Sequence, residues 1–346
     1  MSYLKRVSVL FSVIVLSLFG ISNASGFGKF IPELPISGKP FSPPVFIKRG
    51  FVAIYDSSYK RVQGGRESVS TSMSVFLVTY ADAKRVVGQL IIIPNITGLI
   101  SAYDFEEQGR MGSFFMNPEF LVFLKKKPYT WVEISGNTVH FKTNNSDSVI
   151  TYNSKGLMVN GSITRSFFGG IERSVILLKW NGYVELPPLP QKFPQTVAMD
   201  HYYTISTILT SWTGAPQENV IGQVHIVPGE SIGQVMKFRQ TFQGNTSMNF
   251  PETKELIGST LRGPFYIHPD YLATLKTGMI IMSIPAVNLF YKVTNVDNNI
   301  VRIDNFHNGK SVNYAIYQRA TGLLVMQVTS VDTGGIPLTI IYRLSR

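Results

Sequence analysis

The sequence predicts a mainly β protein made of two tandem repeats. Each repeat is expected to be an antiparallel, strongly curved sheet or sandwich with one short α-helix packed on it. Three observations lead to this class: alternating strand patterns joined by turn residues, one marked helix start in each half, and a duplication within the chain. None of the 346 residues is cysteine, so core packing rather than disulfides has to hold the fold together.

The duplication is inferred from three short sequence segments, called phrases below, that recur in the same order in the two halves of the chain. The matched segments are 88–94 with 222–228, 112–125 with 263–276, and 152–158 with 317–324. The offset is about 17 residues larger at the second phrase than at the first. We therefore expect an insertion in the second copy, within residues 232–261.

Proline-rich stretches stand before each copy and mark the expected domain starts, because proline cannot join the interior of a sheet. The predicted organisation is a signal peptide at 1–24, a Pro-rich segment at 25–45, a first repeat at 46–185, a Pro-rich linker at 186–195 and a second repeat at 196–346.

The N-terminus has the layout of a secretory signal. Lys5 and Arg6 precede an apolar run at 7–19, and the small residue Ala24 follows. This run is too short to cross a bilayer as a helix, and no later stretch is long enough. We expect export to the periplasm, cell surface or extracellular space, with no transmembrane segment in the mature chain.

The composition restricts the kinds of partner and cofactor. A formal net charge of +11 favours anionic partners, which include a lipid, a glycan, a membrane surface or an envelope protein. The charge is spread along the chain, which disfavours nucleic acid as the partner. The absence of cysteine excludes thiolate sites, and the five histidines lack the close spacing of metal ligands. The sequence therefore predicts neither a cofactor nor a metal.

Each repeat carries one helix start. Asn117 and His268 occupy the N-cap position, and Pro118 and Pro269 the first helical position. Apolar residues at helical spacing follow, so each helix should cover part of the sheet of its own repeat.

Turn residues predict hairpins at three places. Gly136-Asn137, Asn160-Gly161 and the segment 297–299 each separate two runs with strand-like alternation. Both repeats are therefore predicted to be antiparallel β meanders.

Four lysines near the expected helix ends are candidate contacts for an anion or a charged surface: Lys125, Lys126, Lys127 and Lys276. Cations at a helix C-terminus also interact favourably with the helix dipole, so simple helix termination explains them equally well. The sequence leaves both interpretations open.

A Gly-x-Ser-x-Gly pattern at 229–233 suggests an enzyme as the alternative. In that hypothesis Ser231 is the nucleophile of a secreted serine hydrolase, with Asp304 and His307 in suitable chain order. The surrounding hairpins do not match the strand-to-helix turn that presents such a serine, and the first repeat lacks a serine at the matching place.

By elimination, the sequence favours an exported, non-catalytic binding protein of the cell envelope or extracellular space. The ligand would be apolar or anionic. A secreted serine hydrolase and a structural subunit of an envelope assembly are the alternatives.

The hydrolase hypothesis predicts ester turnover that disappears in Ser231→Ala, because the attacking hydroxyl is lost while folding stays intact. Hydrolysis of p-nitrophenyl acetate by the two proteins measures this. Equal turnover, or none in the unmodified protein, would remove the hypothesis.

Overall fold

The structure is a computed structural model in which the chain forms two compact units. Unit 1 comprises residues 1–96 and 105–183, and unit 2 comprises residues 97–104 and 184–346. The residues that the structure describes are 41–95, 100–126, 129–167, 169–187, 201–209, 217–232, 235–244, 254–259, 265–332 and 337–345. The predicted signal peptide and most of both Pro-rich segments lie outside these residues.

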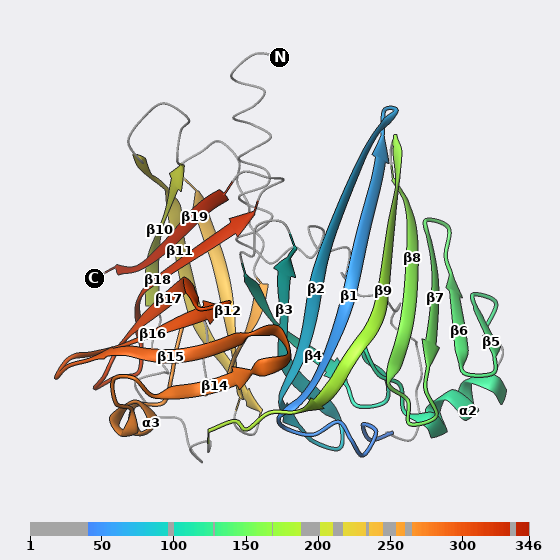
Figure 1. Ribbon diagram of the computed structural model, residues 1–346, viewed down its shortest axis with the longest axis horizontal. Coiled ribbons are helices and arrows are strands. Elements are labelled where there is room, and N and C mark those ends of the chain that lie inside the picture. The colour runs from blue at the N-terminus through green and yellow to red at the C-terminus, as the bar shows by residue number, and fades with distance from the viewer. Residues whose placement is uncertain are drawn as a thin grey trace. The chain divides into compact units, whose positions relative to one another are not determined.

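Unit 1 is built on one antiparallel sheet with the strand order β4-β3-β2-β1-β9-β8-β7-β6-β5 (Figure 1). The chain runs outward from β1 to β4, passes through the helix α2, and returns from β5 to β9, which pairs with β1. The elements are β1 (Phe51–Gln63), β2 (Arg66–Ala81), β3 (Arg85–Pro94), β4 (Ser101–Gln108), α2 (Pro118–Lys126), β5 (Val132–Ser135), β6 (Thr138–Lys142), β7 (Ser146–Tyr152), β8 (Met158–Phe167) and β9 (Gly170–Tyr183). The first four residues of β4, 101–104, are grouped with unit 2 although the strand belongs to this sheet.

Unit 2 repeats this path with one more strand, in the order β13-β12-β11-β10-β19-β18-β17-β16-β15-β14. Its elements are β10 (His201–Leu209), β11 (Gln217–Ile232), β12 (Val235–Gly244), β13 (Lys254–Ser259), α3 (Pro269–Thr274), β14 (Ile280–Ile284), the 3-10 turn η2 (Pro285–Val287), β15 (Leu289–Val296), β16 (Ile300–His307), β17 (Lys310–Gln318), β18 (Leu324–Asp332) and β19 (Pro337–Ser345). The predicted class, two antiparallel β sheets with one short helix each, is confirmed.

The helix starts are those that the sequence predicts. Asn117 Oδ1 accepts hydrogen bonds from the backbone N–H groups of Glu119 (2.7 Å) and Phe120 (3.2 Å). In unit 2, His268 Nδ1 accepts from the N–H of Asp270 (3.2 Å). Each side chain satisfies backbone donors that have no partner within the helix.

Aromatic side chains fill the core of unit 1. The Phe114 ring lies 4.6 Å from Phe76 and 5.8 Å from Phe105 between centroids, and all three belong to one apolar cluster on the inner face of the sheet. The buried side of α2, formed by Phe120, Leu121 and Leu124, joins the same cluster. In this unit the abundant phenylalanine therefore packs a core.

Two of the three predicted hairpin turns are confirmed. Gly136, with φ +58°, joins β5 to β6, and Asp297 Oδ1 accepts the N–H of Asn299 (2.7 Å) in the turn between β15 and β16. The turn predicted at Asn160-Gly161 is wrong, because both residues lie inside β8. Gly161 pairs with neighbours on both sides, and a Cβ there would meet the Ile176 side chain at 3.1 Å, so the glycine serves close packing.

The strand order also corrects the alignment of the two repeats. From the first strand to the helix, equivalent elements of the two units are separated by a nearly constant number of residues. The strands β1 and β10 begin at 51 and 201, and the helices α2 and α3 begin at 118 and 269. Gly88 lies in the third strand of unit 1, whereas Gly222 lies in the second strand of unit 2. The insertion expected within 232–261 is therefore misplaced, and the extra strand of unit 2 is β14, after the helix. Apolar strand phrases resemble one another, and only the pairing order shows which are equivalent.

The other two repeated phrases meet each other in space. In each unit the segment before the helix and the turn before β8 or β18 are joined by two backbone hydrogen bonds, which we call the phrase bridge. The bonds run from the N–H of Met116 to Gly156 O (2.8 Å), Met158 to Phe114 O (2.9 Å), Ile267 to Gly322 O (2.9 Å) and Leu324 to Phe265 O (3.0 Å).

The phrase bridge requires a glycine in each unit. Gly156 and Gly322 have φ of +87° and +79°, which side chains of L-residues rarely adopt. A Cβ on either would lie 2.0 Å from the carbonyl oxygen of Met116 or Ile267. The glycines allow the two backbone segments to approach this closely.

We expect Gly156→Ala to lower the free energy of unfolding by about 2–4 kcal/mol, because left-handed strain and a backbone clash add together. Gly169→Ala is the matched control, since Gly169 has φ +81° but no atom within 4 Å of an added Cβ. It should cost only about 1 kcal/mol. Urea titration followed by circular dichroism measures both, and equal losses would contradict the role of the close approach.

Candidate functional site

The candidate site is a pocket of about 610 Å³ in unit 1, which we call the unit 1 pocket. It lies where the chain enters β1, the N-terminus of α2, the β7–β8 turn and the end of β9 come together. Its lining residues are Pro43, Pro44, Val45, Phe46, Lys48, Asn117, Pro118, Glu119, Lys155 and Tyr183.

Hydrogen bonds hold the wall that precedes β1. Asn117, which caps α2 through its side-chain oxygen, also donates from Nδ2 to the Ser42 carbonyl (2.7 Å). The Tyr183 hydroxyl donates to the Phe46 carbonyl (2.7 Å), so one side chain from β9 anchors the wall at its other end. Three proline rings contribute further surface with fixed φ angles. The pocket is therefore formed mostly before any ligand enters.

Aromatic rings provide the apolar surface of the pocket. Tyr183 lies edge-on to Phe51 with 5.7 Å between ring centroids, and Phe46 lies 5.1 Å from Phe51. Although these contacts fix its ring, Tyr183 keeps 51% of its surface exposed. An exposed but immobile ring suits stacking on a ligand.

Two lysines give the pocket a net positive charge. Lys48 Nζ lies 4.9 Å from the centre of the Tyr183 ring, within the range of a cation–π contact. Lys155 enters from the β7–β8 turn, whose backbone is fixed by the bond from its own N–H to Asn153 Oδ1 (3.0 Å). Within the described part of the chain neither ammonium forms an ion pair, and Glu119 is the one acidic residue of the lining.

The helix end contributes little to binding an anion in this pocket. Asn117 already occupies the N–H groups of Glu119 and Phe120, and Pro118 has no N–H. Any anion in the unit 1 pocket would therefore contact the lysine ammonium groups.

No pattern in the sequence links these lysines, because Lys48 and Lys155 are separated by more than a hundred residues. The candidates chosen from the sequence lie elsewhere. Lys125 and Lys126 are exposed at the C-terminal end of α2, opposite the end that lines the pocket, and Lys276 is exposed after α3. Lys127 lies outside the described residues.

Ser231 lies near the end of β11, in an antiparallel hairpin with β12, and pairs with Met236. A nucleophile elbow requires a strand followed by a turn and a helix, and the described backbone here passes from strand to strand. Its side chain is outside what the structure describes.

Asp304 and His307 lie on β16 but on opposite faces of the sheet, because they are three residues apart on a strand. His307 Nε2 lies 3.3 Å from Asn308 Nδ2. Four strands separate β16 from β11 in the sheet order. Within the described residues, the structure does not bring the three proposed catalytic residues into a triad.

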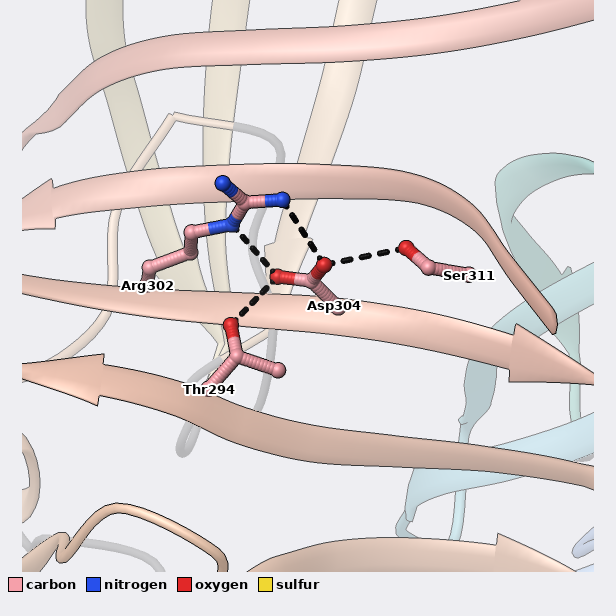
Figure 2. A network of polar contacts seen from close by, with 4 residues as sticks. All are labelled: Thr294, Arg302, Asp304 and Ser311. Carbon is pink, nitrogen blue, oxygen red and sulfur yellow. Dashed lines mark hydrogen bonds and ion pairs between the residues drawn. The ribbon is translucent and has the colours of Figure 1, made fainter. Parts of the chain in front are cut away.

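Figure 2 shows that Asp304 instead belongs to a polar network on neighbouring strands. Its Oδ1 accepts from Arg302 Nε (2.7 Å) and the Thr294 hydroxyl (2.6 Å), and its Oδ2 accepts from Arg302 Nη2 (2.9 Å) and the Ser311 hydroxyl (2.9 Å). The Arg302 guanidinium also lies 3.9 Å from the centre of the Tyr314 ring. This network joins β15, β16 and β17.

Burial raises the pKa of the Asp304 carboxyl, but hydrogen bonds from Arg302, Thr294 and Ser311 outweigh it and hold that pKa below its ordinary value. Such a carboxylate stays ionised and stabilises the fold, whereas a general acid or base needs a pKa near the working pH. The network is structural.

The pKa of the Glu107 carboxyl, on β4, is shifted in the opposite direction to that of Asp304. Burial raises this pKa, and the hydrogen bond that Oε1 accepts from Ser113 N–H (2.7 Å) offsets this only in part. Oε2 is buried without a partner among the described residues, beside Gly112. Glu107 is not part of the pocket lining, and its visible role is to hold the backbone at 113.

No helix among the described residues is long and apolar enough to cross a membrane. In the same part of the chain, no three histidine, aspartate or glutamate side chains gather as metal ligands would.

No protein-family model matches the sequence, and no curated protein matches it at a significant level. Three solved structures overlap much of the chain at low similarity. They are a protein of unknown function from the DUF3598 family of Nostoc punctiforme (7% identity, 85% of this chain and 95% of that chain, TM-score 0.21), kievitone hydratase from Nectria haematococca (10%, 90% and 93%, 0.18) and PNGF-II (10%, 84% and 67%, 0.15). TM-scores this low assign neither a family nor a function.

We expect Asp304→Asn to lower the free energy of unfolding at pH 7 by about 2 kcal/mol, because Arg302 loses its buried charged partner. The pKa of Asp304 is lowered by folding, so its stabilisation is complete above the unfolded pKa of about 3.9. The difference between the two proteins should shrink as the pH falls below that value. Urea titrations from pH 3 to 8 measure it.

Asp56→Asn is the control, since Asp56 pairs with Lys179 at the surface (3.3 Å) and the change should cost no more than about 0.5 kcal/mol. An equal loss in the two variants, or a difference that persists at low pH, would contradict this role of Asp304.

Proposed function

We propose that this chain is an exported, non-catalytic binding protein whose unit 1 pocket takes an amphipathic anion. Such a ligand has an aromatic or aliphatic body and one carboxylate, sulfonate or phosphate group. The observation that carries the proposal is a pocket with aromatic and proline walls in which two lysines lack a carboxylate partner among the described residues.

The size and rigidity of the unit 1 pocket support a small ligand. Its volume of about 610 Å³ lies within the range of small-molecule sites. Because hydrogen bonds from Tyr183 and Asn117 already hold the wall, little conformational entropy is lost when a ligand binds.

The charge of the pocket supports an anion. Lys48 and Lys155 outnumber the one carboxylate, Glu119, and the whole chain has a formal net charge of +11, which attracts anions at long range. Both lysine side chains are exposed, so an entering anion can reach their ammonium groups.

The lining also supports binding rather than catalysis. None of the described lining residues is serine, threonine or histidine, and the Tyr183 hydroxyl is occupied by the Phe46 carbonyl. A nucleophile and a base within hydrogen-bond reach of each other are the minimum for covalent catalysis. Export is supported by the N-terminal sequence pattern, and the intact mass of the secreted chain, expected to begin at Ser25, checks it.

The binding proposal is tested with the probe 1-anilinonaphthalene-8-sulfonate, which combines an aromatic body with one sulfonate. We expect saturable binding to the folded protein. Lys48→Gln with Lys155→Gln should weaken it at least tenfold, about 1.4 kcal/mol, because both cations near the sulfonate are lost. Fluorescence titration measures the affinity, and circular dichroism checks that the variant is folded.

The matched control is Lys125→Gln with Lys126→Gln, which makes the same change in net charge at the other end of α2. It should leave the affinity unchanged. If both double variants weaken binding equally, the probe senses net charge rather than the pocket, and the proposal fails. The uncharged analogue N-phenyl-1-naphthylamine should bind more weakly and should not respond to either pair of substitutions.

A further inference from the structure

Four uncharged polar side chains lie together on the inner face of the sheet of unit 2. Asn305 on β16 pairs with Asn313 on β17, and Asn313 pairs with Thr329 on β18. Gln327 lies two residues before Thr329 on the same face, and its Nε2 donates to the Thr329 hydroxyl (3.0 Å). We call these four residues the amide cluster.

The amide cluster is on the opposite face from the network of Asp304. Side chains alternate along β16, so Asn305 shares a face with the buried residues Val301 and Ile303, whereas Arg302 and Asp304 share the other. The side chains of Arg302 and Asp304 therefore point away from the amide cluster.

The hydrogen-bonding capacity of the cluster is mostly unused. Asn305 is 0% exposed, and neither its Oδ1 nor its Nδ2 has a partner among the described residues. Asn313 is 5% exposed; its Nδ2 donates to the Ile100 carbonyl (3.1 Å), and its Oδ1 has no partner. A buried polar group without a hydrogen-bond partner lowers the free energy of unfolding, so its presence needs a specific explanation.

Unit 1 shows that the fold itself does not need these amides. Counting back from the equivalent residues Tyr152 and Tyr317, the positions of Asn305, Asn313 and Thr329 are taken in unit 1 by Phe141, Ser148 and Ile163. All three residues of unit 1 are at most 2% exposed. At equivalent positions, the sheet of unit 1 is thus packed with buried side chains, whereas the sheet of unit 2 carries amides without hydrogen-bond partners.

The surroundings of the cluster give access and surface for a ligand. Gln327 and Thr329 are only half-buried although they face inward, so water reaches this part of the inner face. Tyr342 on β19 pairs with Gln327 and lies on the same face. Tyr203, fully buried on β10, has a hydroxyl without a partner in the described part of the chain.

We propose that the amide cluster binds a neutral, hydroxyl-rich ligand, a saccharide. Side-chain amides and hydroxyls offer donors and acceptors together, and so does each hydroxyl of a sugar, so the two sets match without any charge. Tyr342 on the same face packs edge-on to Phe265, with 6.2 Å between the ring centroids, and its half-buried side chain leaves part of its surface for sugar C–H groups. A charged ligand would find no oppositely charged side chain of β16 here, because the ionised residues of that strand lie on the other face.

The experiment is isothermal titration of the full mature protein with maltose, N-acetylglucosamine and glucuronate, each to about 10 mM. We expect saturable binding of at least one neutral sugar and none of glucuronate. Asn305→Leu and Asn313→Leu should each weaken that binding at least tenfold. Asn295→Leu is the matched control, because Asn295 is exposed on the adjacent strand β15, and it should bind as the unmodified protein does.

Thermal unfolding without ligand gives a second readout. If the Asn305 amide is kept for a ligand, Asn305→Leu removes an unsatisfied buried group and should raise the Tm by about 2–4 °C. If the amide instead holds a structural water, the Tm should fall, and the proposal is overturned. It is also overturned if neither neutral sugar binds, or if Asn305→Leu binds as tightly as Asn295→Leu.

This site and the unit 1 pocket are tested independently. The amide cluster belongs to unit 2, and its experiment changes no residue of the pocket, whereas the lysine variants leave unit 2 untouched. Failure of one proposal therefore leaves the other standing.

Discussion

The phrase bridge is the contact on which the arrangement of each unit depends. Two backbone hydrogen bonds join the segment before the helix to the turn before β8 or β18. These segments come from the two halves of the strand order, one leading from the outgoing meander and the other belonging to the returning one. The bridge forms only because Gly156 or Gly322 allows the backbones to meet at van der Waals distance. The same pair of hydrogen bonds occurs in both units, between segments that are also similar in sequence.

The bridge of unit 1 also builds the pocket. Gly156 places its turn against the Pro118 ring, so the neighbouring Lys155 is brought beside the N-terminus of α2. The equivalent residue in unit 2 is Thr321, and the helix cap there is His268 in place of Asn117. The backbone contact is thus shared, whereas the lysine beside it in unit 1 is replaced by threonine in unit 2. The two units therefore share the backbone hydrogen bonds of the phrase bridge but differ in the side chains beside it.

The interiors of the two sheets differ in the same way. Aromatic and aliphatic side chains pack the core of unit 1, and burial raises the pKa of the Glu107 carboxyl in this unit. Unit 2 keeps the tyrosine equivalent to Tyr152, but it has Asn305, Asn313 and Thr329 at the positions of Phe141, Ser148 and Ile163. Amides inside a sheet reduce stability unless they are satisfied, so they are more informative about binding than an apolar core is.

The class of fold, the helix starts at Asn117 and His268, and the hairpin turns at 136–137 and 297–299 could all be predicted from the sequence. These features depend on residues close together in the chain, since a cap, a proline or a glycine acts on the backbone within a few positions. The pairing of the strands was needed to show that Asn160-Gly161 lies within β8 and that the extra strand of unit 2 is β14. Only the tertiary structure brought Lys48, Lys155 and Tyr183 to one pocket. The physical reason is that strand order and register join residues a hundred or more positions apart, and apolar alternation is too alike from strand to strand to specify which ones pair.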